Sequence, residues 1–330
     1  MEERDIRELL SINTTLPDVA PEHVHSTAQC LETPQGTGLW ILDVLIGAIA
    51  LVGLGENTIV LWLLRFRLPS TAFSVYILNL AAADALLLLC MVLNSVLLRV
   101  CTIPHDESLF KFMDLGKFFP YITGMSFLSA ISTERCLSTL YPVWYRCCRP
   151  RRTSAAVCAL LWALNFLLTV TEGLCCGLHT RGDSSKVCRP LDVIIMVWLA
   201  FLLFVLCGSS LTLLVRVQCV SLHAQPPRLY VIILFVVLVF LLCGQPLGIC
   251  DGLLRLEAIS KEKMTPYVKR ACILLSCVNS SANPVIYFFV GSGRQKLRSR
   301  RSLKLVLQRA LEEEPEIEGG RDIQLLETEQ

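Results

Sequence analysis

Seven apolar runs, each long enough to cross a lipid bilayer, constrain the fold of this chain more than any other feature. A membrane-spanning helix needs about 20 predominantly apolar residues. The runs lie near residues 39–64, 72–98, 109–141, 153–175, 191–217, 228–252 and 266–290. The connections between them are short, so the spans must pack as one antiparallel bundle. The sequence therefore predicts an all-α membrane protein, a seven-transmembrane helix bundle with a short amphipathic eighth helix.

The amino-acid composition agrees with an integral membrane protein. Hydrophobic residues make up 54% of the chain and charged residues only 18%. Soluble domains carry about a quarter of charged residues, so a soluble fold is disfavoured. Most of the 16 cysteines lie inside the apolar runs, where cysteine behaves as a small buried hydrophobe rather than as part of a disulfide scaffold.

Arginine is distributed unevenly between the two sets of connections. The connections 65–71, 142–152 and 218–227, with their flanks, contain arginine and no Asp or Glu, whereas the opposite connections mix both signs. Cytoplasmic loops carry the excess of basic residues in membrane proteins. We therefore expect a multi-pass plasma-membrane protein with its N-terminus outside the cell and its C-terminus inside.

The two ends of the chain differ from the spans and define the remaining domains. Residues 1–38 are polar and predict a disordered extracellular tail, in which Asn13 begins a glycosylation sequon. Residues 39–290 form the seven-transmembrane domain, and 291–330 form a cytoplasmic amphipathic helix followed by an acidic tail. Basic and apolar residues alternate over 294–311, which predicts a helix on the anionic inner leaflet of the membrane.

The third span ends in a charged pair, Glu134 and Arg135, and continues into an arginine-rich loop that contains Pro142. Charges at the end of a buried membrane helix are costly to keep there, so they are functional by default. The alternative interpretation of Arg135 is a side chain that only reaches out to the interface. The same span carries small residues that allow neighbouring helices to approach closely: Gly124, Ser126, Ser129, Ala130 and Ser132.

A single carboxylate, Asp84, lies in the middle of the second span. A charge at that depth costs about 2.5–3.5 kcal/mol on scales of membrane insertion, so it requires polar partners. Asn57, Asn279 and Asn283 lie in other spans and are the expected partners. The sequence therefore predicts a buried polar network around Asp84.

Several of these residues coincide, span by span, with the pattern of rhodopsin-like receptors. They are Asn57, Asp84, Arg135, Trp162, Pro246 and the run Asn283-Pro284-Val285-Ile286-Tyr287. Longer strings narrow the resemblance: FSVYILNLAAAD, LSAISTERCLS, YPVWYRC, LVFLLCG and CVNSSANPVIYFFVGS. With them the chain resembles the Mas-related G-protein-coupled receptors, closest to their X subfamily. The resemblance extends from the first span to residues 303–311.

The resemblance implies a cell-surface receptor with no cofactor, no nucleic-acid partner and no enzymatic activity. Members of this family in sensory neurons and mast cells respond to basic peptides and small cationic amphiphiles. They act through heterotrimeric G proteins, mainly Gq and also Gi, and arrestin is a further partner. We therefore expect a role in itch or pain sensing or in mast-cell activation.

The resemblance also implies which residues form the activation switch. They are Asn57, Asp84, Glu134, Arg135, Gly244, Pro246, Asn279, Asn283, Pro284 and Tyr287. Local polar partners hold the arginine in inactive receptors. Pro246 removes a backbone donor and kinks the sixth span, with or without a signalling role. Gly244 stands where most rhodopsin-like receptors have tryptophan, which predicts a ligand pocket without a bulky floor. A sodium ion at Asp84 is the alternative to a purely polar network, and Gly124 replaces the serine that would favour it.

A disulfide is expected at the outer side of the membrane. Most rhodopsin-like receptors tie the second outer loop to the third span, but the position required there is Phe110. The resemblance implies a bond between the end of the fourth span and the loop before the fifth, which Cys176 and Cys188 satisfy on the oxidising side. Cys175 competes for Cys188. Cys30 and Cys101 are candidates for a second outer bond.

Three carboxylates are the expected ligand site. Glu172 lies four residues before Cys176, and Asp192 lies four residues after Cys188. Both match the acidic pair that receives the cationic group of an agonist in the X subfamily. Asp251 would add a third acid, at a place where the family tends to have an aromatic residue. The alternative interpretation of the pair is two solvated carboxylates at helix ends.

A transporter, a membrane enzyme and a decoy receptor are the alternatives to a signalling receptor. A small-solute transporter would be expected to show internal repeats or paired broken helices, and neither is found in the sequence. A membrane enzyme is disfavoured because HExxH and GxSxG are both missing from it. An unresponsive or decoy relative of the same receptors is the main alternative, and it would bind ligand without nucleotide exchange.

Overall fold

The computed structural model describes residues 37–67, 71–97, 107–150, 152–177, 184–220, 228–255 and 265–292. The chain divides into two units, Met1–Thr37 and Gly38–Gln330, and the helices described here belong to the second. The predictions for Asn13, for the Cys30–Cys101 bond and for the amphipathic helix over 294–311 lie outside the described residues.

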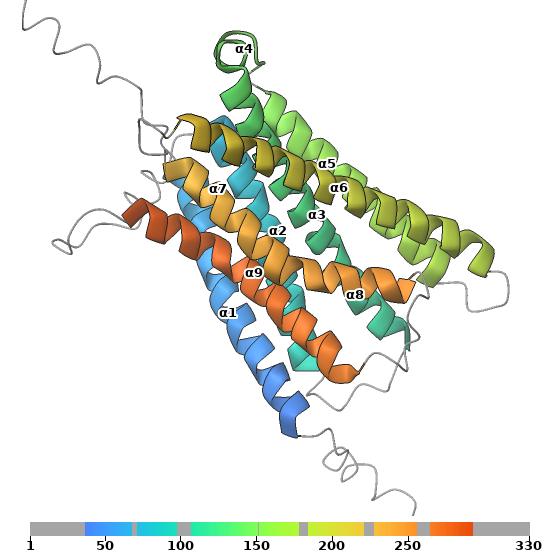
Figure 1. Cartoon of the computed structure of the whole chain (residues 1–330). Helices are drawn as coiled ribbons and strands as arrows, with labels where there is room; N and C mark the ends of the chain where they lie inside the picture. Colours follow the sequence, from blue (N-terminus) through green and yellow to red (C-terminus); the bar gives the residue numbers. More distant parts are fainter. Residues whose placement is uncertain are drawn as a thin grey trace, which may run out of the picture. The chain divides into compact units, whose positions relative to one another are not determined.

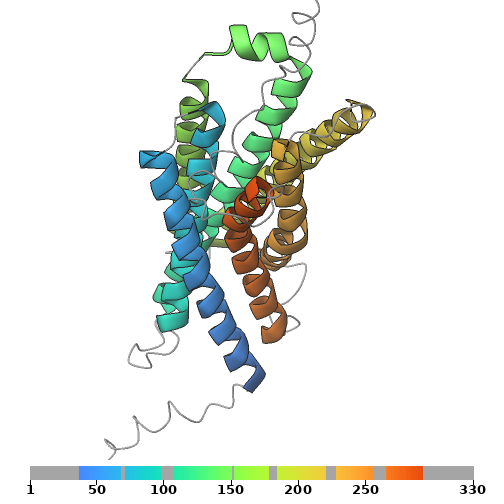
Figure 2. The same cartoon turned by 90° about the vertical axis from the view of Figure 1, so that its left-hand side faces the viewer.

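The described residues form seven long helical spans and no strand (Figure 1). The spans are α1 (Thr37–Phe66), α2 (Ala72–Leu97), α3 (Glu107–Leu140), α5 (Thr153–Glu172) with η2 (Gly173–Gly177), α6 (Ser184–Val220), α7 (Arg228–Val239) with η3 (Phe240–Gly244) and α8 (Gln245–Arg255), and α9 (Pro266–Ser292). The short helix α4 (Pro142–Cys147) lies across one end of the bundle (Figure 2). The predicted fold class is confirmed. The fifth predicted span begins earlier than expected, at Ser184, because its first turns are too polar to register as a membrane span.

Five of the described helices are long and apolar enough to cross a membrane: Gly38–Phe66, Ala72–Leu97, Thr153–Cys176, Cys188–Arg216 and Ile232–Leu254. The other two spans, α3 and α9, have 34 and 27 residues and are more polar. Lysines near their first turns and hydroxyl or amide side chains along their length lower their hydropathy. These two helices carry half of the buried polar and charged side chains among the described residues.

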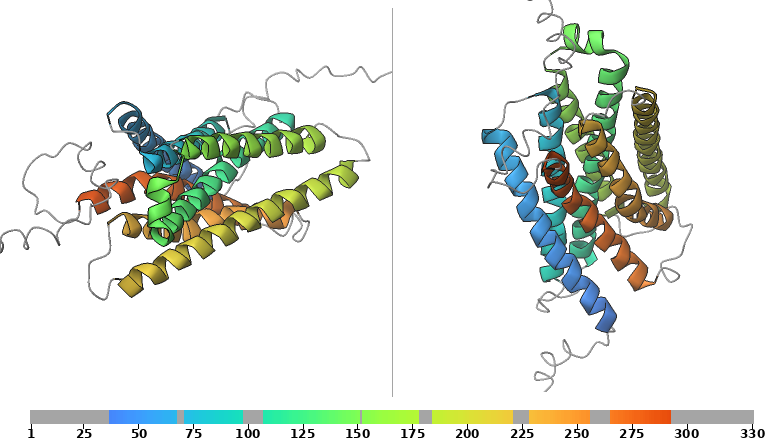
Figure 3. Two further views of the ribbon diagram at one scale, coloured as in Figure 1. Left: turned by 90° about the horizontal axis from the view of Figure 1, so that it is seen from above. Right: turned by 60° about the vertical axis from the view of Figure 1, so that its left-hand side comes forward.

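Helix α3 occupies the middle of the bundle, where it contacts α2, α5 and α6 (Figure 3). Its small polar residues form the contact with α6. Ser129 Oγ donates to the carbonyl oxygen of Leu202 at 2.9 Å, and Ser132 Oγ lies 2.7 Å from Ser210 Oγ. Small side chains allow close helix approach in membranes, and interhelical hydrogen bonds then stabilise the contact. The predicted role of the small residues in α3 agrees with this packing.

The sixth span changes direction between α7 and α8 (Figure 1). Its helix widens to a π-helical turn over η3, in which the N–H of Gln245 donates to the carbonyl oxygen of Phe240, five residues earlier. Pro246 follows directly and has no N–H to donate. A wide turn and a proline therefore combine to bend this span, as expected for Pro246, and π-helical turns occur often at functional sites.

The apolar core consists of two separate clusters. The larger cluster packs α1, α2, α3, α5, α6 and the α7–η3 part of the sixth span together, and the smaller one packs α1, α2, α8 and α9 around Tyr121. Along α2, Ala83 belongs to the larger cluster and Leu87 to the smaller one. Asp84 lies between these two positions, so its buried carboxyl group interrupts the apolar core along α2.

The bundle has two ends, called the disulfide end and the α4 end. The disulfide end is where α5 ends and α6 begins, joined by the Cys176–Cys188 bond. The antiparallel order places the start of α1, the end of α8 and the start of α9 at the same end. The α4 end is the opposite one, where α3 ends and α5 begins.

Candidate functional site

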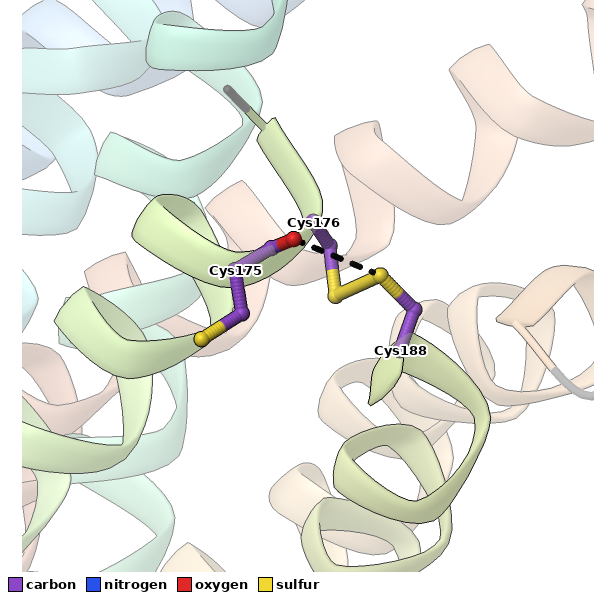
Figure 4. Close-up of a disulfide and its surroundings, with 3 residues drawn as sticks. All are labelled: Cys175, Cys176 and Cys188. Carbon is purple, nitrogen blue, oxygen red and sulfur yellow. Dashed lines mark hydrogen bonds between the residues drawn. A yellow bond between two sulfur atoms is a disulfide. The ribbon is translucent and has the colours of Figure 1, made fainter. Parts of the chain in front are cut away.

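At the disulfide end, Cys176 and Cys188 form the expected bond, with their Cα atoms 5.4 Å apart (Figure 4). Cys176 lies in the π-helical turn η2, and Cys188 lies near the start of α6. The competitor Cys175 is a free thiol whose side chain points away from Cys188. The bond therefore ties the fourth and fifth spans together where both reach the disulfide end.

Glu172 lies on the buried face of α5 and has only 8% of its surface exposed. The other buried residues of α5 recur at helical spacing on that face: Ser154, Cys158, Asn165 and Thr169. This face is directed toward the bundle interior, since Asn165 bonds to α3 and to α6. A freely solvated carboxylate at a helix end does not fit this burial.

Asp192 is half-buried on the first turns of α6 after Cys188. It precedes Ile195, Leu199 and Leu202 at spacings of three and four residues, and these three are buried. Residues at such spacings share one helix face. Asp192 therefore lies on the inward face of α6. The structure thus places both acids of the predicted pair on inward faces, each one turn from the disulfide.

Asp251 on α8 lies in a mixed-charge cluster at the disulfide end. Lys117, Lys269 and Asp114 are all within electrostatic reach of its carboxyl group. Lys117 Nζ lies 2.6 Å from Asp114 Oδ1, and Lys269 Nζ lies 3.9 Å from Asp114 Oδ2. Two lysines thus balance two aspartates, and this part of the disulfide end is less acidic than the predicted three-acid mouth.

The predicted polar network forms around Asp84, which is 4% exposed. Asn283 Nδ2 donates to Asp84 Oδ2 at 2.7 Å. Asn57 Nδ2 donates to the carbonyl oxygens of Gly53 and Ser280, at 2.9 and 3.0 Å, and so ties α1 to α9. The third predicted partner, Asn279, is buried and lies beside Gly244.

Gly124 is the position that bears on a sodium ion at Asp84. A Cβ added at Gly124 would lie 3.9 Å from Asp84 Oδ1, so the glycine leaves room but offers no oxygen ligand. Among the described side chains, no group of three His, Cys, Asp or Glu is arranged to hold a metal ion. The residues fit a polar network, and sodium at Asp84 stays a prediction.

Buried aromatic side chains surround Gly244. A Cβ at this position would lie 2.7 Å from the ring of Phe240 and 3.3 Å from Asn279. The hydroxyl of Tyr121 donates to the carbonyl oxygen of Gly244 at 3.2 Å. Phe240 and Tyr121 are both buried next to Gly244, and a ligand pocket without a bulky floor stays a prediction.

The two members of the predicted charged pair at the α4 end, Glu134 and Arg135, contact different neighbours. Glu134 Oε1 accepts hydrogen bonds from Arg149 and from the hydroxyl of Tyr76, each at 2.8 Å. Arg149 also donates to Ser154 Oγ at 2.7 Å. Arg135 is 4% exposed, and its guanidinium lies over the ring of Phe73, 3.7 Å from the centroid. Arg149 thus fastens the loop after α4 onto α3.

This cluster shifts the pKa values of two side chains in the connection after α3, Tyr145 and Arg149. Burial and the nearby charge of Glu134 raise the pKa of Tyr145. Burial alone would lower the pKa of Arg149, but the hydrogen bond and the charge of Glu134 outweigh it and raise that pKa. Arg149 therefore stays charged throughout the physiological pH range.

Reasoning from the sequence missed two further residues, Arg149 and Asn165. Arg149 is one of several arginines in its loop, and no sequence signal distinguishes it as the partner of Glu134. Asn165 is fully buried, donates to Ser126 Oγ at 3.0 Å and accepts from the indole N–H of Trp198 at 3.1 Å. The signal for Asn165 was available, because an amide inside an apolar span requires partners.

The remaining predicted switch residues lie in α9. Pro284 is buried inside that helix, one residue after Asn283. Tyr287 lies in the same helix, and its side chain is not among those described.

Comparison with known proteins identifies the family. The model of the 7 transmembrane receptor (rhodopsin family) matches residues 56–287. The Mas-related G-protein coupled receptor member X1 of Homo sapiens is 51% identical over 279 residues, which are 84% of this chain and 85% of that receptor. Member X3 of Homo sapiens is 50% identical over 272 residues, 82% of this chain and 83% of that receptor. Member X2 of Rhinopithecus bieti is 48% identical over 297 residues, 88% of each chain. The chain therefore belongs to the Mas-related G-protein-coupled receptors of the rhodopsin family, and it is a multi-pass membrane receptor rather than an enzyme.

Proposed function

We propose that this receptor binds a cationic peptide or a small cationic amphiphile at the disulfide end and activates a heterotrimeric G protein at the α4 end. The observation that carries the proposal is the position of Glu172 and Asp192. Each lies one turn from the Cys176–Cys188 bond, on the inward face of its helix. A cationic group between two such carboxylates would make charge-assisted hydrogen bonds in a partly desolvated place, where they are strong.

The orientation in this proposal has the disulfide end outside the cell. Arginines at the α4 end support it, because basic connections face the cytoplasm. The disulfide supports it as well, since such bonds persist on the oxidising side of the membrane. Asp251 adds a third acid to the ligand site, with Lys117 and Lys269 setting the net charge around it.

Signalling in this proposal depends on the α4 end. Ligand binding favours the conformation in which Arg135 becomes accessible to the G protein, and it does so only through a higher affinity for that conformation. Asn57, Asp84, Asn279 and Asn283 connect the spans between the two ends, and the bend at Gly244 and Pro246 lets the sixth span move. Coupling to Gq and also Gi, arrestin binding, and a role in itch, pain or mast-cell activation extend the family resemblance to this chain.

The test is a calcium assay in cells that express the receptor, with a panel of basic peptides and amphiphilic amines. Each charged contact contributes about 1.5–3 kcal/mol, which corresponds to a potency loss of roughly 10- to 100-fold on its removal. We expect that loss for Glu172→Gln and for Asp192→Asn, with unchanged receptor at the cell surface.

The matched control is Glu56→Gln, which neutralises a half-buried carboxyl group in α1, a helix that does not contribute to the proposed pair. We expect unchanged potency for this variant. Unchanged potency in Glu172→Gln and Asp192→Asn would contradict the ligand site. Agonist binding to the wild-type receptor without nucleotide exchange on any G protein would instead identify a decoy receptor.

A further inference from the structure

Cys250 and Cys272 are two free thiols that the proposed receptor mechanism does not use. Cys250 lies on α8 and Cys272 on α9, 22 residues apart in the sequence, and their Sγ atoms are 3.0 Å apart. Non-bonded heavy atoms pack at about 3.5–4.0 Å, so this contact is closer than ordinary packing. A disulfide bond is about 2.05 Å long, so an approach of about 1 Å would bring the two sulfurs to bonding distance.

The surroundings of the pair suit oxidation by a small molecule. Cys272 is buried in the smaller apolar cluster, and Cys250 is half-buried at its edge. Both lie in the part of α8 and α9 that reaches the disulfide end, the end that the proposed function places on the oxidising side. The more accessible Cys250 would meet an oxidant first, and Cys272 is within reach to resolve it.

We propose that Cys250 and Cys272 form a redox-sensitive pair, which hydrogen peroxide oxidises to a disulfide that joins the sixth and seventh spans. In the first step the deprotonated Cys250 sulfur attacks one peroxide oxygen. An S–O bond forms, the O–O bond breaks, and the departing hydroxide takes the cysteine proton to become water. In the second step Cys272 sulfur attacks Cys250 sulfur. The S–S bond forms, the S–O bond breaks, and hydroxide leaves with the second proton as water. Two thiols and one peroxide thus give one disulfide and two waters, with two electrons passing from sulfur to peroxide.

The bond would also affect the ligand site, and this part rests on the proposed function. Asp251 follows Cys250 directly, and Lys269 precedes Cys272 by three residues. The carboxyl group of Asp251 lies within electrostatic reach of both Lys269 and Cys272. A covalent link between α8 and α9 would fix the two charged residues relative to each other and restrict opening of the sixth span at this end.

Peptide mapping of the full-length receptor in membranes tests the bond itself, without any agonist. Membranes are treated with hydrogen peroxide or left untreated, the remaining free thiols are then blocked with N-ethylmaleimide, and the protein is digested with trypsin without reduction. Cleavage after Arg228, Arg255, Arg270 and Arg294 places Cys250 in the peptide 229–255 and Cys272 in the peptide 271–294. We expect the two peptides to be linked after oxidation and separate after reduction.

Each of these peptides contains one other cysteine, which provides the matched controls. Cys243 shares the peptide of Cys250, and Cys277 shares that of Cys272. The link is expected to survive in Cys243→Ser and Cys277→Ala and to be lost in Cys250→Ser and Cys272→Ser. Its absence from the oxidised wild type, or its presence in Cys250→Ser, would overturn the proposed pair.

A calcium assay then separates the bond from its effect on signalling. Peroxide is expected to shift agonist potency at the wild type and to leave it unchanged at Cys250→Ser. If the linked peptide forms but agonist potency at the wild type does not change, the disulfide is supported and its control of the ligand site is overturned. Failure of every agonist would count against the proposed function, while peptide mapping would still decide whether the bond forms.

Discussion

The contact between Glu134 and Arg149 is expected to make a large contribution to stability that depends on both partners. Arg149 Nη2 lies 2.8 Å from Glu134 Oε1, and the two side chains are 7% and 13% exposed. Most of the water around this pair has therefore been removed. Truncation of one partner of a buried ion pair costs about 3–5 kcal/mol, because the other charge stays buried without compensation.

The three variants of a double-mutant cycle differ in what they leave buried. Arg149→Met leaves the carboxylate of Glu134 with the Tyr76 hydroxyl, so we expect a loss of about 3–5 kcal/mol. Glu134→Gln keeps an acceptor for the Tyr76 hydroxyl, and Arg149 keeps its hydrogen bond to Ser154. The expected loss for this variant is therefore about 1–3 kcal/mol. In the double variant neither member of the pair is charged. Its expected loss is below the sum of the two single losses by about 2 kcal/mol or more.

The measurement is the free energy of unfolding of the purified receptor in mild detergent, obtained from denaturant titrations followed by circular dichroism. The matched control is a second cycle on Asp114 and Lys269, an ion pair between α3 and α9 in which the side chains are 60% and 47% exposed. Exposed pairs couple by less than about 1 kcal/mol. Losses at Glu134 and Arg149 that add within about 0.5 kcal/mol would refute the reasoning, because independent sites behave in that way.

Three further predictions follow from contacts described above. Gly244→Ala is expected to destabilise the receptor by about 1–3 kcal/mol, since its Cβ would lie 2.7 Å from the Phe240 ring, and Phe240→Leu in the same chain should restore the thermal midpoint. Asn165→Leu leaves the indole N–H of Trp198 without its acceptor, at a cost of about 1–3 kcal/mol that should largely disappear in combination with Trp198→Phe. Because the pKa of Tyr145 is raised in the folded receptor, its contribution to stability is complete below the ordinary tyrosine pKa of about 10 and is lost as pH rises above it. The alkaline loss of stability, measured as the thermal midpoint against pH, should therefore be smaller in Tyr145→Phe than in the wild type.

The number and order of the spans followed from the sequence because runs of spanning length recur along it, although α3 and α9 are more polar than the other five. The same criterion misplaced the start of α6, where the polar residues before Pro190 continue the helix beyond the apolar run. It also gave no indication of the wide turns η2 and η3. A π-helical turn depends on how one helix fits against its neighbours, and a hydropathy pattern contains no such information.

The site residues were predictable to the extent that a buried polar group must find a partner. That requirement led to the contact between Asp84 and Asn283, which lie 199 residues apart. It did not identify Arg149 as the partner of Glu134, because the path of the connection after α3 decides which arginine arrives there. Tyr76 was likewise unpredictable, since its hydroxyl reaches Glu134 only through the packing of α2 against α3.

The interruption of the apolar core at Asp84 has a consequence for how a disturbance crosses the bundle. Each cluster is close-packed and resists deformation, so it tends to shift as one body. Between the two bodies, amide and carboxyl groups can exchange hydrogen-bond partners at a small net cost in free energy. Because α1, α2 and α3 contribute residues to both clusters, a shift of one cluster reaches the other along these helices, and exchange of hydrogen bonds near Asp84 allows this without unfolding either cluster.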